Sequence, residues 1–401
     1  MKNGWIRTPL SEVAAVQSGA GFPDRYQGHA DREIPFYKVS DMNIAGNEHE
    51  MVYENNSITE EVRRKLRAFL FPKGSTIFPK IGGAIATNKK RLTTRDCCVD
   101  NNVMGVIPRP GKIESDFLFY FFLAHDLSEF ANEAHLPSIK KTVVESWPII
   151  LPASLPEQHR IVGILDEAFE GIATAKANAE KNLQNARALF ESHLQSVFAD
   201  AWRTCELVRL SDLASEITDG DHLPPPKSPT GVPFITIGNI VKQTRKIDFA
   251  DTFMVPHTYF NALRPNKKPK KGDVLYTVTG SFGIPVMVSE TVEFCFQRHI
   301  GLIRPKSETS STWLYYLLLS PQVFKQANDG ATGTAQKTVS LKLLRNFEVP
   351  KVTPKQQLSA VAKLDTLSTE TQRLATIYEH KLATLEALRK SLLHQAFAGQ
   401  L

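Results

Sequence analysis

The stretch that decides the fold is Glu157–Phe198, EQHRIVGILDEAFEGIATAKANAEKNLQNARALFESHLQSVF, which contains no proline. Apolar or small residues return along it at steps of three or four, the spacing of one helix face. They are Ile161, Leu165, Ala168, Ile172, Ala175, Ala179, Leu183, Ala186, Phe190, Leu194 and Val197. A helix of roughly 40 residues, ~60 Å long, exceeds ordinary globular length. Its single narrow stripe predicts that it packs against a partner helix.

A second proline-free stretch, Lys355–Phe397, has the same character near the end of the 401-residue chain. Its stripe runs through Leu364, Leu367, Leu374, Tyr378, Leu382, Leu385, Leu388 and Leu392. Both stretches begin just after a proline, which suits the first turn of a helix. Each helix is the obvious partner of the other. An antiparallel coiled coil is therefore predicted, with a globular part at either end and the two chain termini close together.

The sequence contains an internal repeat, since seven landmarks recur in the same order at offsets of 196 to 200 residues. The pairs are Leu10–Ala14 with Leu210–Ala214, Ile34–Phe36 with Val232–Phe234, Lys73–Phe78 with Lys271–Tyr276, Phe117–Tyr120 with Trp313–Tyr316, Lys141–Val143 with Lys337–Val339, Pro156–Gln158 with Pro354–Gln356, and Ser192–Ala199 with Ser391–Ala398. Chance similarity would not keep that order. The sequence therefore predicts a tandem duplication.

Each copy opens with about 150 residues of short β-type runs, turns and one or two helices. The predicted class is an α+β protein: a mixed α/β domain followed by a long helix, duplicated in tandem. The predicted boundaries are residues 1–153 and 204–351 for the globular domains, and 154–203 and 352–401 for the helices. The aromatic runs Phe117–Phe122 and Trp313–Leu319 are too apolar for a base-stacking platform and are expected in the core.

Composition points to a folded protein with 42% hydrophobic and 22% charged residues. The first ten residues, MKNGWIRTPL, lack the apolar core of a secretory signal, and no run is long enough to span a bilayer. A cytoplasmic location without a membrane partner is expected. The net charge of +6 fits a polyanionic partner without requiring one. Cys97 and Cys98, which lack metal-ligand spacing, are expected to be buried in a strand.

Known catalytic patterns are missing. The sequence has no GxxxxGK[ST] phosphate loop, no HExxH or CxxC metal pattern and no GxSxG elbow. The run Asp221–Pro226, DHLPPP, lacks the spacing of a methyltransferase pocket. A non-catalytic protein is therefore predicted. The alternatives are a two-domain scaffold that binds proteins, or a stand-alone nuclease or methyltransferase fragment.

The whole chain resembles the specificity subunits of Type I restriction–modification systems. The residues that carry the resemblance are Leu155–Val162 (LPEQHRIV), Ile217–His222 (ITDGDH) with Pro225, and Leu210–Ala214 (LSDLA). Two features depart from the family pattern. The second helix opens Pro354–Gln357 (PKQQ) without the acidic residue, and the first copy has Gln17–Phe22 (QSGAGF) in place of the ITDGDH loop.

The resemblance implies a function and partners. The two domains would be target-recognition domains, each binding one half of a bipartite double-stranded DNA target, and the helices would fix the gap. The helices would also dock two methyltransferase (modification) subunits, and the restriction/translocase subunits would join through that core. No cofactor is expected on this chain, since S-adenosylmethionine, Mg and ATP would be bound by those partners.

Candidate DNA contacts are polar or basic residues near turns, because polar groups read base edges and cations bind phosphates. In the first domain they are Lys80, Asn88, Lys89, Lys90, Arg91, Ser138, Lys140 and Lys141. In the second they are Asp219, His222, Lys267, Lys268, Lys270, Lys271, Thr279, Ser281, Thr334, Gln336 and Lys337. The segment Lys80–Arg91 is the strongest of these, as a glycine-rich turn after a strand that ends in three cations. The competing interpretation is a hairpin with a solvated basic tip.

Overall fold

The computed structural model describes residues 4–289, 291–334 and 336–401. The chain divides into two compact units. The first comprises the residues up to Glu180 together with His380–Leu401, and the second is Lys181–Glu379. Each unit therefore holds one globular domain and a segment of each long helix, and both ends of the described chain belong to the first unit.

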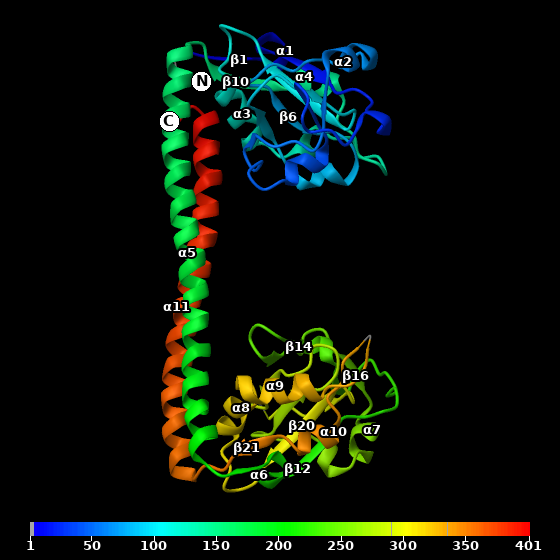
Figure 1. Cartoon of the computed structure of the whole chain (residues 1–401), viewed down its shortest axis with the longest axis vertical. Helices are drawn as coiled ribbons and strands as arrows, with labels where there is room; N and C mark the ends of the chain where they lie inside the picture. Colours follow the sequence, from blue (N-terminus) through cyan, green and yellow to red (C-terminus); the bar gives the residue numbers. More distant parts are fainter. Residues whose placement is uncertain (1–3, 290, 335) are drawn as a thin grey trace. The chain divides into compact units, whose positions relative to one another are not determined.

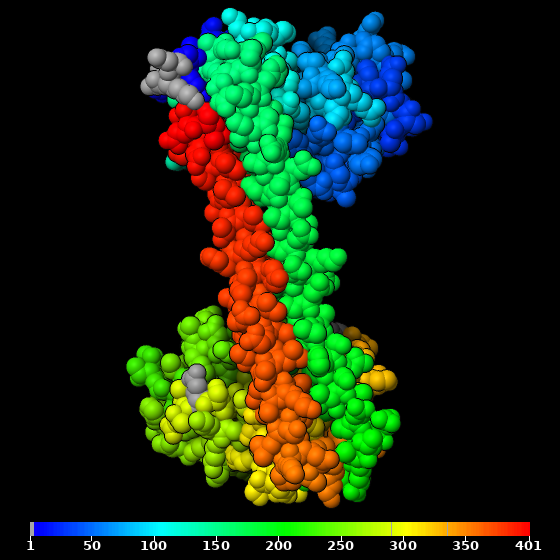
Figure 2. Space-filling view, turned by 90° about the vertical axis from the view of Figure 1, so that its left-hand side faces the viewer, coloured from blue at the N-terminus to red at the C-terminus, as the bar shows by residue number. Residues whose placement is uncertain are grey.

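The two predicted long helices are present as α5 (Leu155–Thr204) and α11 (Pro354–Phe397). Within each unit, the segments of α5 and α11 lie side by side and run in opposite directions (Figure 1). Figure 2 shows the same neighbouring segments in space-filling form, green for α5 and orange to red for α11. The predicted antiparallel packing therefore holds inside each unit.

Each pair of helix segments shares a hydrophobic core with its globular domain. In the first unit, Leu393 of α11 lies in the same core as Ile161 of α5. In the second, Leu364 of α11 shares a core with Leu194 and Phe198 of α5. The helix stripes are thus buried where the domains attach, which ties each domain to both helices.

The described residues of the first unit form three small sheets. The strand orders are β2 (Ala14–Ser18), β9 (Val103–Pro108), β6 (Thr76–Pro79), β7 (Arg91–Thr93) and β4 (Glu50–Met51); then β5 (Ser57–Ile58), β3 (Ile34–Tyr37) and β8 (Cys98–Val99); then β1 (Trp5–Pro9) and β10 (Pro148–Pro152). The helices are α1 (Leu10–Val13), α2 (Glu60–Leu66), α3 (Ser115–Ala124) and α4 (Lys141–Ser146). Strand β1 pairs antiparallel with β10, so the start of the domain is fastened next to the start of α5.

The second unit repeats this plan. Its sheets are β12 (Ala214–Asp219), β20 (Ile300–Pro305), β17 (Val274–Thr277) and β18 (Pro285–Met287); then β16 (Phe253–Val255), β13 (Val232–Ile235) and β19 (Cys295–Phe296); then β14 (Ile240–Val241) with β15 (Lys246–Ile247), and β11 (Leu207–Arg209) with β21 (Glu348–Pro350). The helices are α6 (Leu210–Leu213), α7 (His257–Ala262), α8 (Ser311–Leu319), α9 (Pro321–Gly330) and α10 (Leu341–Arg345). The first unit's β2–β9–β6 order matches β12–β20–β17 here, so the α+β class is confirmed.

The aromatic runs are core, as predicted. Every residue of Phe117–Phe122 in α3 is at most 3% exposed, and Trp313 in α8 is 1% exposed. Cys98 is fully buried in β8, and Cys97 is fully buried just before it, in an isolated bridge with Phe71. Burial raises the pKa of the Cys98 thiol to about 12, so both cysteines behave as apolar filler, as expected.

Two of the seven repeat landmarks were paired in the wrong register. Gln158 is equivalent to Gln357 rather than to Gln356, because Gln158 and Gln357 make matching hydrogen bonds. Lys141 opens α4, whereas Lys337 lies in the bridged segment before α10. The shared Lys-Thr-Val letters arose by coincidence, and main-chain pairing gives an offset of 200 there.

Among the described residues, no helix is both long and apolar enough to cross a membrane.

Candidate nucleic-acid interface

A groove of about 340 Å³ lies where the second unit's β17 and β20 meet the segment before α10. It is lined by Asp219, His222, Val278, Thr279, Arg298, His299, Gln336, Thr338, Val339, Ser340 and Leu341. We call it the second-unit groove. It brings together four of the predicted DNA contacts: Asp219, His222, Thr279 and Gln336.

Main-chain hydrogen bonds build one wall of this groove. Thr279 pairs with Thr338 in an isolated antiparallel bridge. On either side, Val339 N donates to Val278 O at 2.8 Å and Gly280 N donates to Lys337 O at 3.1 Å. The strand β17 is thereby extended past its end, and a polar segment is held against it.

A charged network holds the opposite wall. Lys267 Nζ donates to Asp219 Oδ1 at 2.9 Å and to the carbonyl of Gly220 at 2.8 Å, while His222 Nε2 lies 2.8 Å from Asp219 Oδ2. Burial raises the pKa of the Asp219 carboxyl, but the hydrogen bonds from Lys267 and His222 outweigh it and leave that pKa below its usual value. Lys267 therefore positions the loop that carries Asp219 and has little capacity left for a phosphate.

Arg298 and His299 were missed by the sequence analysis. They lie between β19 and β20 and reach the groove only because β20 pairs with β17. Arg298 is exposed, and burial, aided by the Arg298 charge, lowers the pKa of His299. The available signal was the polar triplet Gln297–His299 between two apolar runs. Arg298 supplies the exposed cation that Lys267 does not.

The first unit repeats the same hydrogen-bonded frame. Ile81 bridges Ser138, Ile139 N donates to Lys80 O at 2.9 Å, and Gly82 N donates to Pro137 O at 2.7 Å. Lys80 thus occupies the position of Val278, and Ser138 the position of Thr338. The predicted contacts Lys80 and Ser138 are brought together on this frame.

Different side chains occupy the equivalent positions in the first unit. Lys80 N donates to Asn102 O at 2.8 Å, just as Val278 N donates to His299 O at 2.9 Å, so Asn102 corresponds to His299. Lys80 Nζ also donates to Ser18 Oγ at 3.1 Å. Burial lowers the pKa of the Lys80 amine. The two units present one backbone frame with different polar chemistry.

A glycine fixes the same close approach in both units. A Cβ on Gly19 would lie 1.9 Å from Asp100 O, and one on Gly220 would lie 2.0 Å from Phe296 O. Both distances are impossible for a side chain, so the backbone needs glycine at both places. The preceding residues, Ser18 and Asp219, are therefore equivalent as well.

Lys90 and Arg91 are buried and are withdrawn as DNA contacts. Lys90 is 2% exposed, and its Nζ donates to Asn88 Oδ1 at 2.6 Å and to His125 O at 2.7 Å. Burial lowers the pKa of Lys90 to about 8. Arg91 is 9% exposed and donates to the carbonyls of Lys90 and Met42. Both cationic side chains therefore bind groups inside their own domain.

The segment between Lys80 and Arg91 is therefore not a hairpin with a basic tip. It forms a 3₁₀ helix, Gly82–Thr87, and then turns at Asn88, whose φ is +53°. Asn88 Oδ1 also accepts from Leu127 N at 2.9 Å. Lys89 donates to Asn43. Asn88 serves this turn, and Lys89 is the part of the cluster that stays partly exposed.

The remaining basic candidates lie at the surface. Lys140 is exposed, and Lys141 forms a 3.6 Å ion pair with Glu145. Lys268 lies over the Phe260 ring, 4.9 Å from its centroid. The remaining lysine candidates, Lys270, Lys271 and Lys337, are exposed, and so is the polar candidate Thr334. Of all these, only Lys337 and Thr334 belong to the segment that builds the groove.

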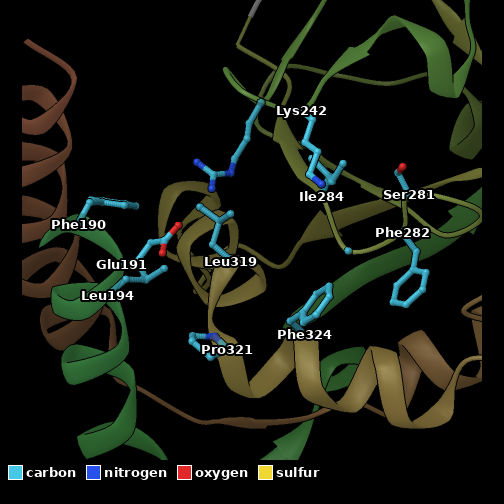
Figure 3. A pocket seen from close by; sticks show the side chains of 12 residues that line it. Phe190, Glu191, Leu194, Lys242, Ser281, Phe282, Ile284, Leu319, Pro321 and Phe324 are labelled. Atoms are coloured by element: carbon cyan, nitrogen blue, oxygen red, sulfur yellow. The ribbon is translucent and has the colours of Figure 1, made fainter. Parts of the chain in front are cut away.

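Ser281 lies in a different pocket of about 480 Å³ (Figure 3). Phe190 and Leu194 enter it from α5, and the rings of Phe282 and Phe324 stack at 6.0 Å between centroids. Ser281 is therefore separated from the predicted contacts that line the second-unit groove. Within the described part of the chain, no three His, Cys, Asp or Glu side chains gather as metal ligands.

Comparison with known proteins gives consistent matches. The sequence matches the family described as Type I restriction modification DNA specificity domain over residues 2–184 and again over 203–380. The EcoDI specificity subunit of Escherichia coli is 31% identical over 139 residues, 33% of this chain and 29% of that one. The chain spans under a third of the length of the curated relatives it matches first.

Two solved structures share the fold across nearly their full lengths. A chain from a study of complex assembly and conformational transition of the type I R-M system has a TM-score of 0.78 at 19% identity, with 100% of this chain and 99% of that chain covered. The HsdS subunit from Thermoanaerobacter tengcongensis has a TM-score of 0.61 at 20% identity, with 100% and 98% covered.

Proposed function

Because the chain belongs to the Type I restriction modification DNA specificity family, we propose that it is the non-catalytic DNA-reading subunit of a Type I restriction–modification complex. Its target is bipartite, and each unit reads one half. The observation that carries the proposal is the repeated frame around Thr279–Thr338 and Ile81–Ser138. One backbone arrangement with two sets of polar side chains is what two different half-sites require.

The second-unit groove has the chemistry of a base-edge reader. Asp219, Gln336 and His299 offer acceptors and donors that match the pattern of base edges in the major groove. The exposed Arg298 adds a cation for a phosphate or a guanine. In the first unit, Ser18 and Asn102 take the positions of Asp219 and His299, and Lys80 takes the position of Val278.

The long helices provide the spacing and the docking surfaces. Helix α5 continues without a break from Glu180 into Lys181, where the units divide, and it would fix the gap between the half-sites. Exposed apolar side chains on the helices support docking: Leu388 is 46% exposed in the first unit, and Leu358 is 67% exposed in the second. Two methyltransferase subunits would bind there, one per unit, and restriction/translocase subunits would join through them.

A binding experiment tests the proposal. The chain, co-purified with its methyltransferase subunits, is titrated with duplex DNA across a series of salt concentrations. Phosphate contacts release counterions, so the logarithm of the association constant should fall linearly with the logarithm of salt concentration. Binding that is independent of salt, or unchanged when this chain is omitted, contradicts the proposal and favours a protein-binding scaffold.

A cofactor experiment separates the scaffold from an enzyme. The chain alone should show no binding of S-adenosylmethionine or ATP by calorimetry, since the proposal assigns both to partner subunits. Tight binding of either by the isolated chain would identify it as a methyltransferase or nuclease fragment.

A further inference from the structure

We propose that Leu136 in the first unit and Gln336 in the second are equivalent base-reading residues, each setting one base pair of its own half-site. The inference rests on the proposed function and adds to it the positions that make the half-sites differ. Leu136 was not recognised from the sequence as a DNA contact.

The two residues occupy the same place on the repeated frame. Gly82 and Gly280 have φ values of +67° and +71°, and each donates its N–H to the residue that follows the proposed reader, Pro137 or Lys337. A Cβ added to Gly82 would lie 3.2 Å from Leu136 Cδ1. A Cβ added to Gly280 would lie 3.1 Å from Gln336 Nε2. Each side chain therefore lies across its glycine.

Both side chains are available to a ligand. Leu136 is 64% exposed, one of the most exposed large apolar side chains in the described chain. Gln336 is exposed and lines the second-unit groove, and its amide makes no hydrogen bond to any other described residue. A single exposed leucine is ordinary on a protein surface. Here, however, it coincides with the position where the other copy has a free amide.

Double-stranded DNA is the partner that suits both residues. A glutamine amide can donate to and accept from the N7 and N6 groups of adenine, and an apolar side chain contacts the methyl group of thymine. The exposed Lys140 and Lys337 lie within four residues and can bind the flanking phosphates. Gln336 would therefore select an adenine in one half-site, and Leu136 a thymine in the other.

Methylome mapping of two variants tests the inference. Leu136→Gln should change one base position in one half of the methylated motif, and Gln336→Leu should change one position in the other half. Val52→Gln and Gln243→Leu are matched controls, because both positions are exposed and belong to none of the segments that form the frame. Each control should leave the motif unchanged.

A second measurement covers variants that lose methylation altogether. Thermal melting confirms that they are folded, and the complex is titrated with duplexes in which each base pair is replaced in turn. For the unsubstituted protein, replacing the contacted pair should weaken binding roughly 5- to 150-fold. In the matching variant, the preference should vanish at the contacted position and remain at every other position.

The outcomes separate the inference from the proposed function. Unchanged motifs and unchanged base preferences in both variants, with a split motif for the unsubstituted protein, overturn the inference alone. A host in which the unsubstituted chain supports no split motif overturns the proposed function itself.

Discussion

Gln158, at the start of α5, and Gln357, at the start of α11, make equivalent sets of three hydrogen bonds. Gln158 Oε1 accepts from Glu114 N at 2.9 Å, and Nε2 donates to the carbonyls of Lys112 and Pro152 at 3.2 and 2.9 Å. The partners of Gln357 are Ser310 N at 2.8 Å, Glu308 O at 3.3 Å and Val352 O at 2.8 Å. Each buried amide thus fastens a long helix to its own domain.

Replacing either glutamine should loosen only its own unit. Gln158→Ala leaves one N–H and two carbonyls without their partner, and unsatisfied groups cost about 1–3 kcal/mol each when buried. We expect the first unit's opening free energy to fall by about 3 kcal/mol, measured by native-state hydrogen exchange. Asn178→Ala, at an exposed position on α5 in the first unit, should change it by less than about 0.5 kcal/mol. Equal loss of protection in both units would contradict local fastening.

Arg298 should contribute one phosphate contact. Arg298→Ala is expected to lower the affinity for DNA. It should also make the slope of the log affinity against the log salt concentration shallower by about one. Arg264→Ala, also exposed in the second unit but outside the groove lining, is the matched control. The measurement is fluorescence anisotropy at several salt concentrations. Equal slopes for the two variants would place Arg298 outside the interface.

Lys90 should make stability depend on pH in the alkaline range. Burial holds its pKa at about 8 in the folded chain, against 10.5 for an ordinary lysine. Between these values the unfolded chain binds the extra proton, so the contribution of Lys90 to the free energy of unfolding should rise with pH, by at most ~1.4 kcal/mol per pH unit. The buried thiols titrate in the opposite direction, so the contribution is measured by urea unfolding as the difference between the unsubstituted chain and Lys90→Met, and Lys270→Met, as the control, should show no such difference. A difference between the unsubstituted chain and Lys90→Met that falls over that range would contradict the buried position.

Cys205 should be the only rapidly reacting thiol. Burial raises the pKa of Cys98 and Cys295 to about 12 and also raises that of Cys97, which suppresses their thiolates. Cys205 is partly exposed at the end of α5. Ellman's reagent should therefore titrate one thiol quickly in the folded chain and all four in denaturant. A fast phase that persists in Cys205→Ser would show that a second thiol is accessible.

The fold could be predicted because its determinants are local or repeated. The steps of three or four along Glu157–Phe198 depend only on neighbouring residues, and α5 covers that whole stretch. The duplication followed from the order of the landmarks. Register was harder, because Gln356 and Gln357 are adjacent and identical, and only the hydrogen bonds of Gln357 identify it as the partner of Gln158.

The interface could be predicted only in part, because burial of a charge depends on tertiary packing. Lys89 and Lys90 are neighbours in the sequence, yet Lys90 points inward to the His125 carbonyl. Arg298 reaches the groove through the pairing of β20 with β17, which no local pattern reveals. Thr279 and Gln336 were predicted as polar residues near turns, and the structure brings both to the groove.

The most direct test of the central claim is a map of N6-methyladenine across the host genome, with and without the gene for this chain. Deletion should abolish methylation at one split motif with a fixed gap and one modified adenine on each strand. Restoring the gene should restore that motif. An unchanged map, with the methyltransferase subunits present and active, would contradict the claim that this chain reads the DNA.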